Sequence, residues 1–237
     1  MKGIILAAGL GRRIRSLTKG VPKPMLCLRG RPIIEYTIRL FRKFGIKDII
    51  INLHYKPDLI VNYLKDGKKF GVRIKYSYEP VLLGTAGAVK KIQPLLNGTF
   101  LVAYGDTLRN IDIADLLKKH SEAKADVTIA LYRTKDLKRC VVAMMRADNS
   151  IYEFIEKPRQ KIVSGYANCG IYCIEPRVLN SIPRGRKCEF GKELFPLLIK
   201  RGFRIYGYPT DAGLLDIGTP ASYARAKKIF SATFKNL

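Results

Sequence analysis

Two aspartates in this chain are placed where carboxylates can serve phosphate chemistry. Asp106 follows the apolar run Phe100–Tyr104, and Asp216 lies between an apolar run and the Thr219-Pro220 pair that begins a predicted helix. We expect Asp106 at the carboxyl edge of a sheet, where Asp216 can converge on it. Together with phosphate oxygens, the two carboxylates would complete the all-oxygen shell that Mg²⁺ prefers. The alternative is that Asp216 ends a turn and Asp106 caps a helix.

The glycine-rich loop after the first strand is the second candidate. Gly9 and Gly11 would let backbone N–H groups approach a phosphate closely, at the sheet edge where α/β proteins bind ligands. Arg13 and Lys23 could bind the phosphate oxygens from two sides. Ile14 occupies the place of the third glycine of a dinucleotide fingerprint, which argues against a Rossmann cofactor site. The chain also has no P-loop motif, which argues against a P-loop nucleotide site. The alternative is a tight turn beside a solvated basic loop.

Strand-like and helix-like patterns alternate along the first half of the chain. The predicted strands are Met1–Leu6, Asp48–Leu53, Arg73–Tyr78 and Phe100–Tyr104. The predicted helices are Ile34–Phe44, Pro57–Leu64 and Thr85–Ile92. This alternation predicts an α/β fold with a mixed, mostly parallel sheet and helices on both faces.

The second half has a less regular pattern. Its strand-like runs are Asp126–Tyr132, Cys140–Arg146, Ile151–Ile155, Asn168–Ile174 and Phe203–Tyr208, and its helices are Pro176–Ser181, Lys192–Lys200 and Pro220–Phe230. We expect it to extend the same sheet and to add a few antiparallel strands. No linker, low-complexity tract or repeat interrupts the chain, so residues 1–237 are predicted to form one domain.

Charge and composition narrow the classes of function. The 237 residues carry a formal net charge of +25, which favours anionic ligands in general. The basic residues are spread along the chain rather than gathered in a tail with aromatic platforms, so we do not expect nucleic-acid binding. A hydrophobic content of 47% is typical of a globular protein and excludes a disordered chain.

The sequence carries no strong signal for a membrane span, a signal peptide or a redox site. No apolar run approaches the roughly 20 residues that span a bilayer. The run Ile4–Leu10 is too short for a signal peptide, so we expect a cytoplasmic protein. The five cysteines are scattered without a Cys-x-x-Cys pair, and Cys169 and Cys173 are expected to be core residues.

The motifs taken together resemble the sugar-1-phosphate nucleotidyltransferases, also called nucleotide-sugar pyrophosphorylases. The segments that carry the resemblance are Leu6-Ala-Ala-Gly-x-Gly-x-Arg-Ile14, Pro22-Lys-Pro-Met25, Leu83-Gly-Thr-Ala-Gly-Ala88, Gly105-Asp106, Phe154-Ile-Glu-Lys-Pro158, Asn168-x-Gly-Ile-Tyr172 and Asp216-Ile-Gly-Thr-Pro220. The resemblance covers Met1 to about Phe230. It implies a Rossmann-like nucleotidyltransferase fold, a Mg²⁺ requirement, and a reaction in which an NTP and a sugar-1-phosphate give an NDP-sugar and pyrophosphate.

The resemblance also implies roles for individual residues. Arg13 and Lys23 would be catalytic, with Arg13 on the departing pyrophosphate and Lys23 on the α-phosphate side. The nucleotide-binding residues would be Ala8, Gly9, Gly11, Arg12, Gly84 and Thr85. The sugar phosphate would meet Glu156, Lys157 and Asn168, and the metal would meet Asp106 and Asp216.

Three positions depart from the family pattern. Arg12 stands where Thr or Ser is usual, Tyr104 stands where Asn commonly precedes Gly-Asp, and no tryptophan precedes Asp216. The chain also stops soon after the last predicted helix, so we expect no C-terminal β-helix.

The segment from Leu83 to Gly87 looks most like the branches that use GTP with mannose-1-phosphate or heptose-1-phosphate. A glucose-1-phosphate thymidylyl- or uridylyltransferase, or a broad-specificity relative, is the first alternative. A non-catalytic regulatory subunit that binds nucleotide sugars is an alternative of another class. The sequence leaves the oligomeric state open.

Overall fold

The structure, a computed structural model, describes residues 1–11, 14, 18, 20–134, 141–156, 165–211 and 214–233, without the side chains at 156, 214, 216 and 231–233. The chain divides into two compact units. The first comprises Met1–Leu82, Ala103–Ile111 and Gly213–Leu237, and the second comprises Leu83–Val102 and Asp112–Ala212. Each unit is therefore built from segments that are distant in sequence, and the expectation of a single domain stays a prediction.

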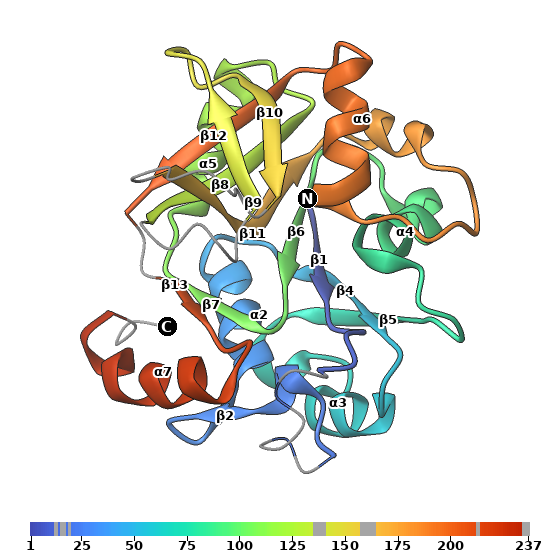
Figure 1. Cartoon of the computed structure of the whole chain (residues 1–237). Coiled ribbons are helices and arrows are strands. Elements are labelled where there is room, and N and C mark those ends of the chain that lie inside the picture. Colours follow the sequence, from blue (N-terminus) through green and yellow to red (C-terminus); the bar gives the residue numbers. More distant parts are fainter. Residues whose placement is uncertain are drawn as a thin grey trace. The chain divides into compact units, whose positions relative to one another are not determined.

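The first unit contains a parallel sheet whose central strand is β4. Strand β4 (Asp48–Leu53) pairs in parallel with β1 (Lys2–Leu6) on one side and with β5 (Arg73–Tyr78) on the other (Figure 1). The helices α2 (Ile33–Lys43) and α3 (Pro57–Leu64) lie between these strands in the chain. Because the three strands run in one direction, their carboxyl ends lie along one edge.

Shorter elements complete this unit. They are the 3₁₀ helices η2 (Lys23–Met25) and η3 (Lys68–Phe70), the paired strands β2 (Cys27–Leu28) and β3 (Arg31–Pro32), the paired strands β7 (Thr107–Arg109) and β13 (Leu214–Asp216), and the helix α7 (Pro220–Thr233).

One apolar core includes residues close in the chain to the two candidate aspartates. Leu108 and Leu215, which are neighbours of Asp106 and Asp216 in the chain, pack in a cluster with residues of α2 and α7. In that cluster the rings of Tyr36 and Phe230 meet edge to face, with their centroids 5.2 Å apart. The packing therefore fixes β7 and β13 against the two helices.

The second unit contains a mixed sheet. Strand β11 (Gly165–Ile174) pairs antiparallel with β8 (Val127–Thr134) and with β9 (Val141–Met145). Strand β9 also pairs antiparallel with β10 (Ile151–Glu156), whereas β12 (Ile205–Thr210) runs parallel to β8. The strand β6 (Phe100–Tyr104) passes from this unit into the first between Val102 and Ala103.

The helices of the second unit are mostly short. They are α4 (Gly84–Lys91), η4 (Gln93–Leu95), α5 (Ile113–Glu122), η5 (Pro176–Ser181), the π-helix η6 (Phe190–Leu194) and α6 (Phe195–Lys200). Buried rings of Tyr172, Phe190 and Phe195 pack together at centroid distances of 5.1 to 5.4 Å. This aromatic cluster joins β11 to the π-helix and α6.

The predicted fold class, α/β with a mixed, mostly parallel sheet flanked by helices, is confirmed. The bounds predicted for β4, α3, β5 and β6 agree with the structure. Helix α5 is not among the predicted elements, although Asp112 caps it by accepting a hydrogen bond from the backbone N–H of Asp115 at 3.0 Å. Pro176–Ser181 is a 3₁₀ helix, and Lys192–Lys200 is the end of a π-helix followed by α6.

Two further sequence expectations concern the cysteines and the membrane. Cys169 and Cys173 are buried free thiols, as expected, and burial raises the pKa of the Cys173 thiol. Within the described part of the chain, every helix is too short or too polar to cross a lipid bilayer.

Gly3 provides a test of how β1 packs on α2. A Cβ at Gly3 would lie 2.5 Å from two ring atoms of Phe41, which is fully buried. We expect Gly3→Ala to lower the free energy of unfolding by about 1–3 kcal/mol, measured by urea denaturation. The matched control is Gly191→Ala, whose Cβ would make ordinary contacts at 3.7 Å. Equal stability of the two variants would show that β1 and α2 are not packed as described.

Candidate functional site

The glycine-rich loop leaves β1 at the carboxyl edge of the parallel sheet. Ala7 and Ala8 are buried, whereas Gly9 is exposed and has no atom within 4 Å of a Cβ built on it. Gly11 adopts a left-handed φ of +59°, and its carbonyl accepts a hydrogen bond from Ile14 N–H at 3.1 Å. The first glycine of the loop, Gly9, thus faces open space. Arg12 and Arg13 lie outside the described residues.

Asp106 lies beside the start of this loop. The backbone N–H of Gly105 donates to the carbonyl of Leu6 at 2.9 Å, which brings the end of β6 against the end of β1. A Cβ at Gly105 would be 2.9 Å from Ile5 Cγ2, so the close approach requires glycine. The expected position of Asp106 at the carboxyl edge therefore agrees with the geometry.

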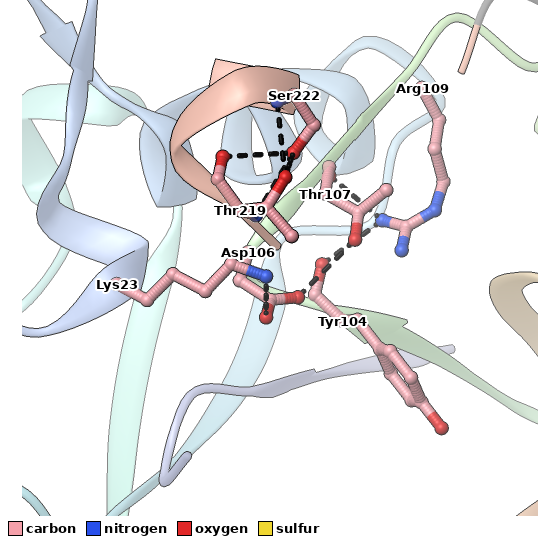
Figure 2. A network of polar contacts seen from close by, with 7 residues as sticks. All are labelled: Lys23, Tyr104, Asp106, Thr107, Arg109, Thr219 and Ser222. Atoms are coloured by element: carbon pink, nitrogen blue, oxygen red, sulfur yellow. Dashed lines mark hydrogen bonds and ion pairs between the residues drawn. The ribbon is translucent and has the colours of Figure 1, made fainter. Parts of the chain in front are cut away.

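Lys23 reaches the same point from η2. This 3₁₀ turn begins after Pro22 and buries the lysine, whose Nζ lies 2.7 Å from Asp106 Oδ2 (Figure 2). A Cβ at Gly11 would be 3.5 Å from Lys23 Cβ, so the turn of the glycine loop lies against the lysine stem. The structure thus brings together the glycine-rich loop, the ammonium of Lys23 and the carboxylate of Asp106.

A hydroxyl donor and two positively charged side chains stabilise the ionised form of Asp106. Thr107 Oγ1 donates to Asp106 Oδ1 at 3.2 Å, and the buried guanidinium of Arg109 donates from Nη1 to the carbonyls of Tyr104 and Thr107, each at 3.0 Å (Figure 2). Burial raises the pKa of Asp106, but the ammonium of Lys23 and the guanidinium of Arg109 outweigh it, so the pKa lies below its usual range. Asp106 is therefore ionised at neutral pH.

Asp216 comes to this point through backbone pairing. Strand β13 runs antiparallel to β7, and in this register Asp216 lies opposite Thr107, the residue after Asp106. The backbone pairing thus places residue 216 beside residue 107. The Asp216 side chain lies outside the described residues, so the convergence of the two carboxylates stays a prediction.

The segment after Asp216 turns into α7. Ser222 N–H donates to Thr219 Oγ1 at 3.1 Å, and Thr219 N–H donates to Ser222 Oγ at 3.0 Å (Figure 2). With Pro220 as the first helical residue, this reciprocal cap begins the helix that the sequence predicts.

Gly84 and Thr85 belong to the second unit, at the start of α4. Thr85 donates to Glu189 Oε2 from its backbone N–H at 3.1 Å and from Oγ1 at 2.7 Å, and its Oγ1 accepts from Phe190 N–H at 2.9 Å. Gly84 has a φ of +73°, and a Cβ there would be 2.6 Å from the Cys188 carbonyl oxygen. The hydroxyl of Thr85 thus already holds the segment that leads into the π-helix.

Asn168 lies in a bulged part of β11 in the same unit. Its Oδ1 accepts from Gly170 N–H at 2.6 Å, and its Nδ2 donates to the hydroxyl of Tyr172 at 2.8 Å. Glu156 is the last residue of β10, and its side chain lies outside the described residues, as does the whole of Lys157.

Several residues of the site are absent from the sequence interpretation. Thr107 follows Asp106 directly and Arg109 lies three residues after Asp106, so both could have been considered from the sequence. Glu189 carried no local signal, because its partner Thr85 is 104 residues away.

The pairing of Lys23 with Asp106 can be measured by a double-mutant cycle. We expect Lys23→Gln and Asp106→Asn to couple by about 1–2 kcal/mol in the free energy of unfolding at pH 7, because the lysine is buried and the aspartate partly so. The pKa of Asp106 is lowered from 3.8, so the coupling should be complete above about pH 5 and should disappear as the pH falls through the folded-state pKa. Coupling that is zero at pH 7, or unchanged in acid, would contradict the ion pair.

Known proteins resemble this chain over most of its length. Residues 2–232 match the family model described as nucleotidyl transferase. The chain is 36% identical to UTP–glucose-1-phosphate uridylyltransferase of a Synechocystis strain, covering all of this chain and 65% of that protein. It is 32% identical to D-glycero-alpha-D-manno-heptose 1-phosphate guanylyltransferase of Aneurinibacillus thermoaerophilus, covering 96% and 97%.

A solved structure is also similar. The crystal structure of HddC from Yersinia pseudotuberculosis complexed with GMP-PN superposes with a TM-score of 0.83 at 27% identity, covering 97% of this chain and 99% of that one. Among the curated relatives, the chain spans 65% of the uridylyltransferase and nearly all of the heptose enzyme. A family match over almost the whole chain, together with these identities, shows that the chain belongs to the nucleotidyl transferase family.

Proposed function

We propose that the chain transfers a nucleotidyl group from an NTP to a sugar-1-phosphate, giving an NDP-sugar and pyrophosphate. The observation that carries the proposal is the Lys23–Asp106 pair, with a separation of 2.7 Å, beside the glycine loop. An ammonium and a carboxylate at the end of a parallel strand suit a reaction between two polyanions. Both groups lie in a chain that belongs to a family of nucleotidyl transferases.

The proposed reaction requires no covalent bond between the protein and either substrate. A phosphate oxygen of the sugar-1-phosphate attacks the α-phosphorus of the NTP, and the bond to pyrophosphate breaks. Neither a covalent intermediate nor a strong general base is needed, because the nucleophile is already anionic. Catalysis then consists of holding the two substrates in line and stabilising negative charge.

Residues of the first unit would each take part in positioning the substrates or in stabilising negative charge. Backbone N–H groups at Ala8, Gly9 and Gly11 would hold the triphosphate, with Arg12 beside them. Lys23 would act at the α-phosphate and Arg13 at the departing pyrophosphate. The stem of Lys23 lies close to Gly11, so its ammonium could turn from Asp106 toward a phosphate bound by the loop.

Mg²⁺ is the cofactor that we propose for this site. Asp106 and Asp216 would supply hard oxygen donors, and the ion pair of Asp106 with Lys23 Nζ at 2.7 Å supports the view that this carboxylate carries a negative charge that a cation can meet. The described residues contain no group of three or more His, Cys, Asp or Glu side chains suited to a metal, so phosphate and water oxygens would supply the other ligands. When bound, the ion neutralises charge on the α-phosphate.

The residues of the second unit would act on the rest of the substrates. Gly84 and Thr85 would lie against the nucleobase, and Glu156, Lys157 and Asn168 would contact the sugar phosphate. Because the Thr85 hydroxyl already bonds to Glu189 and Phe190, we propose that Thr85 shapes the base site mainly by holding this segment in place.

Guanylyl transfer to mannose-1-phosphate or heptose-1-phosphate is the specific reaction that we favour. Similarity to a heptose-1-phosphate guanylyltransferase supports it, and so does similarity to the HddC structure complexed with GMP-PN. Similarity to a glucose-1-phosphate uridylyltransferase supports the alternative of uridylyl transfer. A regulatory subunit that binds without turnover is disfavoured because Lys23 and Asp106 are both in place.

A substrate screen tests the proposal directly. We expect the purified protein to release pyrophosphate only when an NTP and a sugar-1-phosphate are both present, because the sugar phosphate is the attacking group. The five common NTPs are tested against mannose-, heptose- and glucose-1-phosphate, and GTP with a manno-configured sugar phosphate should react fastest.

Controls make the result decisive. EDTA should abolish pyrophosphate release, and added Mg²⁺ should restore it. Lys23→Ala should lower turnover by at least about 100-fold, in line with the loss of one preorganised charge contact. Equal pyrophosphate release from an NTP alone would indicate a hydrolase, and nucleotide-sugar binding without turnover would indicate the regulatory alternative.

A further inference from the structure

Asn52 links two loops at the carboxyl edge of the parallel sheet in the first unit. It lies near the end of the central strand β4, in register with Leu6 of β1 on one side and with Ser77 of β5 on the other. Its Oδ1 accepts a hydrogen bond from the backbone N–H of Ala7 at 2.7 Å. Its Nδ2 donates to Glu79 Oε1, also at 2.7 Å. Ala7 is the first residue after β1, and Glu79 is the first residue after β5.

The chemistry of the partners fixes how the amide is oriented. A backbone N–H can only donate, so the oxygen of the amide must face Ala7. With the amide oxygen on that side, the NH₂ group faces Glu79 and donates to its Oε1. Asn52 is 5% exposed and Glu79 is 1% exposed, so water cannot readily replace either bond. Loss of either bond would leave a buried polar group unsatisfied.

Glu79 is itself held in place by β4. Its backbone N–H donates to the carbonyl of Leu53 at 2.8 Å, and its carbonyl lies 2.7 Å from His54 Nδ1. The carboxylate therefore gives Asn52 a fixed anchor. Through Asn52 this anchor reaches Ala7, whereas the other side of β1 is held by the Gly105 N–H bond to Leu6.

We propose that Asn52 is a positioning residue for the NTP, acting through the backbone of the glycine loop; this inference rests on the proposed function. The Ala7 N–H lies two residues before Gly9, and its bond to Asn52 sets the direction in which the loop leaves β1. The N–H groups of the loop must meet phosphate oxygens within hydrogen-bond geometry. Small displacements in such a site have large effects on binding and rate. Asn52 itself touches no substrate in this arrangement.

A swap of the two side-chain types tests the link. In Asn52→Asp the new carboxylate can still accept from Ala7, but it faces the Glu79 carboxylate and repels it. In the double variant Asn52→Asp/Glu79→Gln, the amide at 79 can donate to the carboxylate at 52, so the chain of bonds is restored with its polarity exchanged. Asn52→Ala removes the amide without adding charge, and it provides a second variant if Asn52→Asp does not fold.

The readouts are the Kd for the NTP, measured by calorimetry without turnover, and the KM for the sugar-1-phosphate. We expect Asn52→Asp or Asn52→Ala to raise the Kd for the NTP by at least about tenfold, the usual consequence of one unmade buried hydrogen bond, with the KM for the sugar phosphate changed less than about twofold. The double swap should return the Kd to within about threefold of wild type.

The matched control is Tyr63→Phe, which removes a hydrogen bond from Tyr63 to the buried Glu35 carboxylate in the same unit. It should lower thermal stability and leave the Kd for the NTP unchanged. An unchanged Kd in the Asn52 variants, equal effects on both substrates, or no rescue by the swap would overturn the inference while wild-type NTP binding upholds the proposed function. No NTP binding by the wild type would overturn the proposed function and the inference with it.

Discussion

A buried ammonium needs a negative partner, and in this protein that need determines how the candidate site is built. Lys23 lies on a short turn between two prolines, far in sequence from the strand that carries Asp106, and the two charges meet at 2.7 Å. The aspartate is held in turn by a threonine hydroxyl and by the field of a buried arginine. The two charges are therefore held together at the carboxyl edge of the sheet before any substrate binds.

The sheet supplies the geometry that this ion pair requires. Parallel strands end on one edge, so the loop after β1, the turn after β6 and the segment after β5 come together without a special connection. Asn52 then fixes the first of these loops to the third through two buried hydrogen bonds. Strand β13 adds Asp216 by pairing with the strand that follows Asp106. Each of these residues and loops lies at or near the end of a strand.

Much of this edge could be predicted from the sequence because its signals are local. The apolar run before Gly105-Asp106, the glycines after the first strand and the Thr219-Pro220 helix start each identify an element and its end. Their convergence then follows from the rule that parallel strands share a carboxyl edge. Lys23 follows Gly11 by 12 residues in the sequence, so the chain can return it to the glycine loop.

The contacts that lock the site could not be predicted in this way. Asn52 lies within an apolar strand, where a single polar residue indicates only that some partner exists. Glu189 holds Thr85 across 104 residues of sequence, and no pattern at either end names the other. The π-helix that begins at Phe190 differs from an α-helix only in its hydrogen bonds, so periodicity in a short segment cannot reveal it. Long-range pairing is a property of the packed fold.

The most direct measurement is a crystal structure with Mg²⁺ and a non-hydrolysable NTP analogue. The account predicts that the α-phosphate lies about 3 Å from Lys23 Nζ, that the glycine-loop backbone contacts the phosphates, and that the ion is bound by Asp106 and Asp216. A nucleotide bound away from this edge, with Lys23 still paired to Asp106 and no ion at either aspartate, would contradict it.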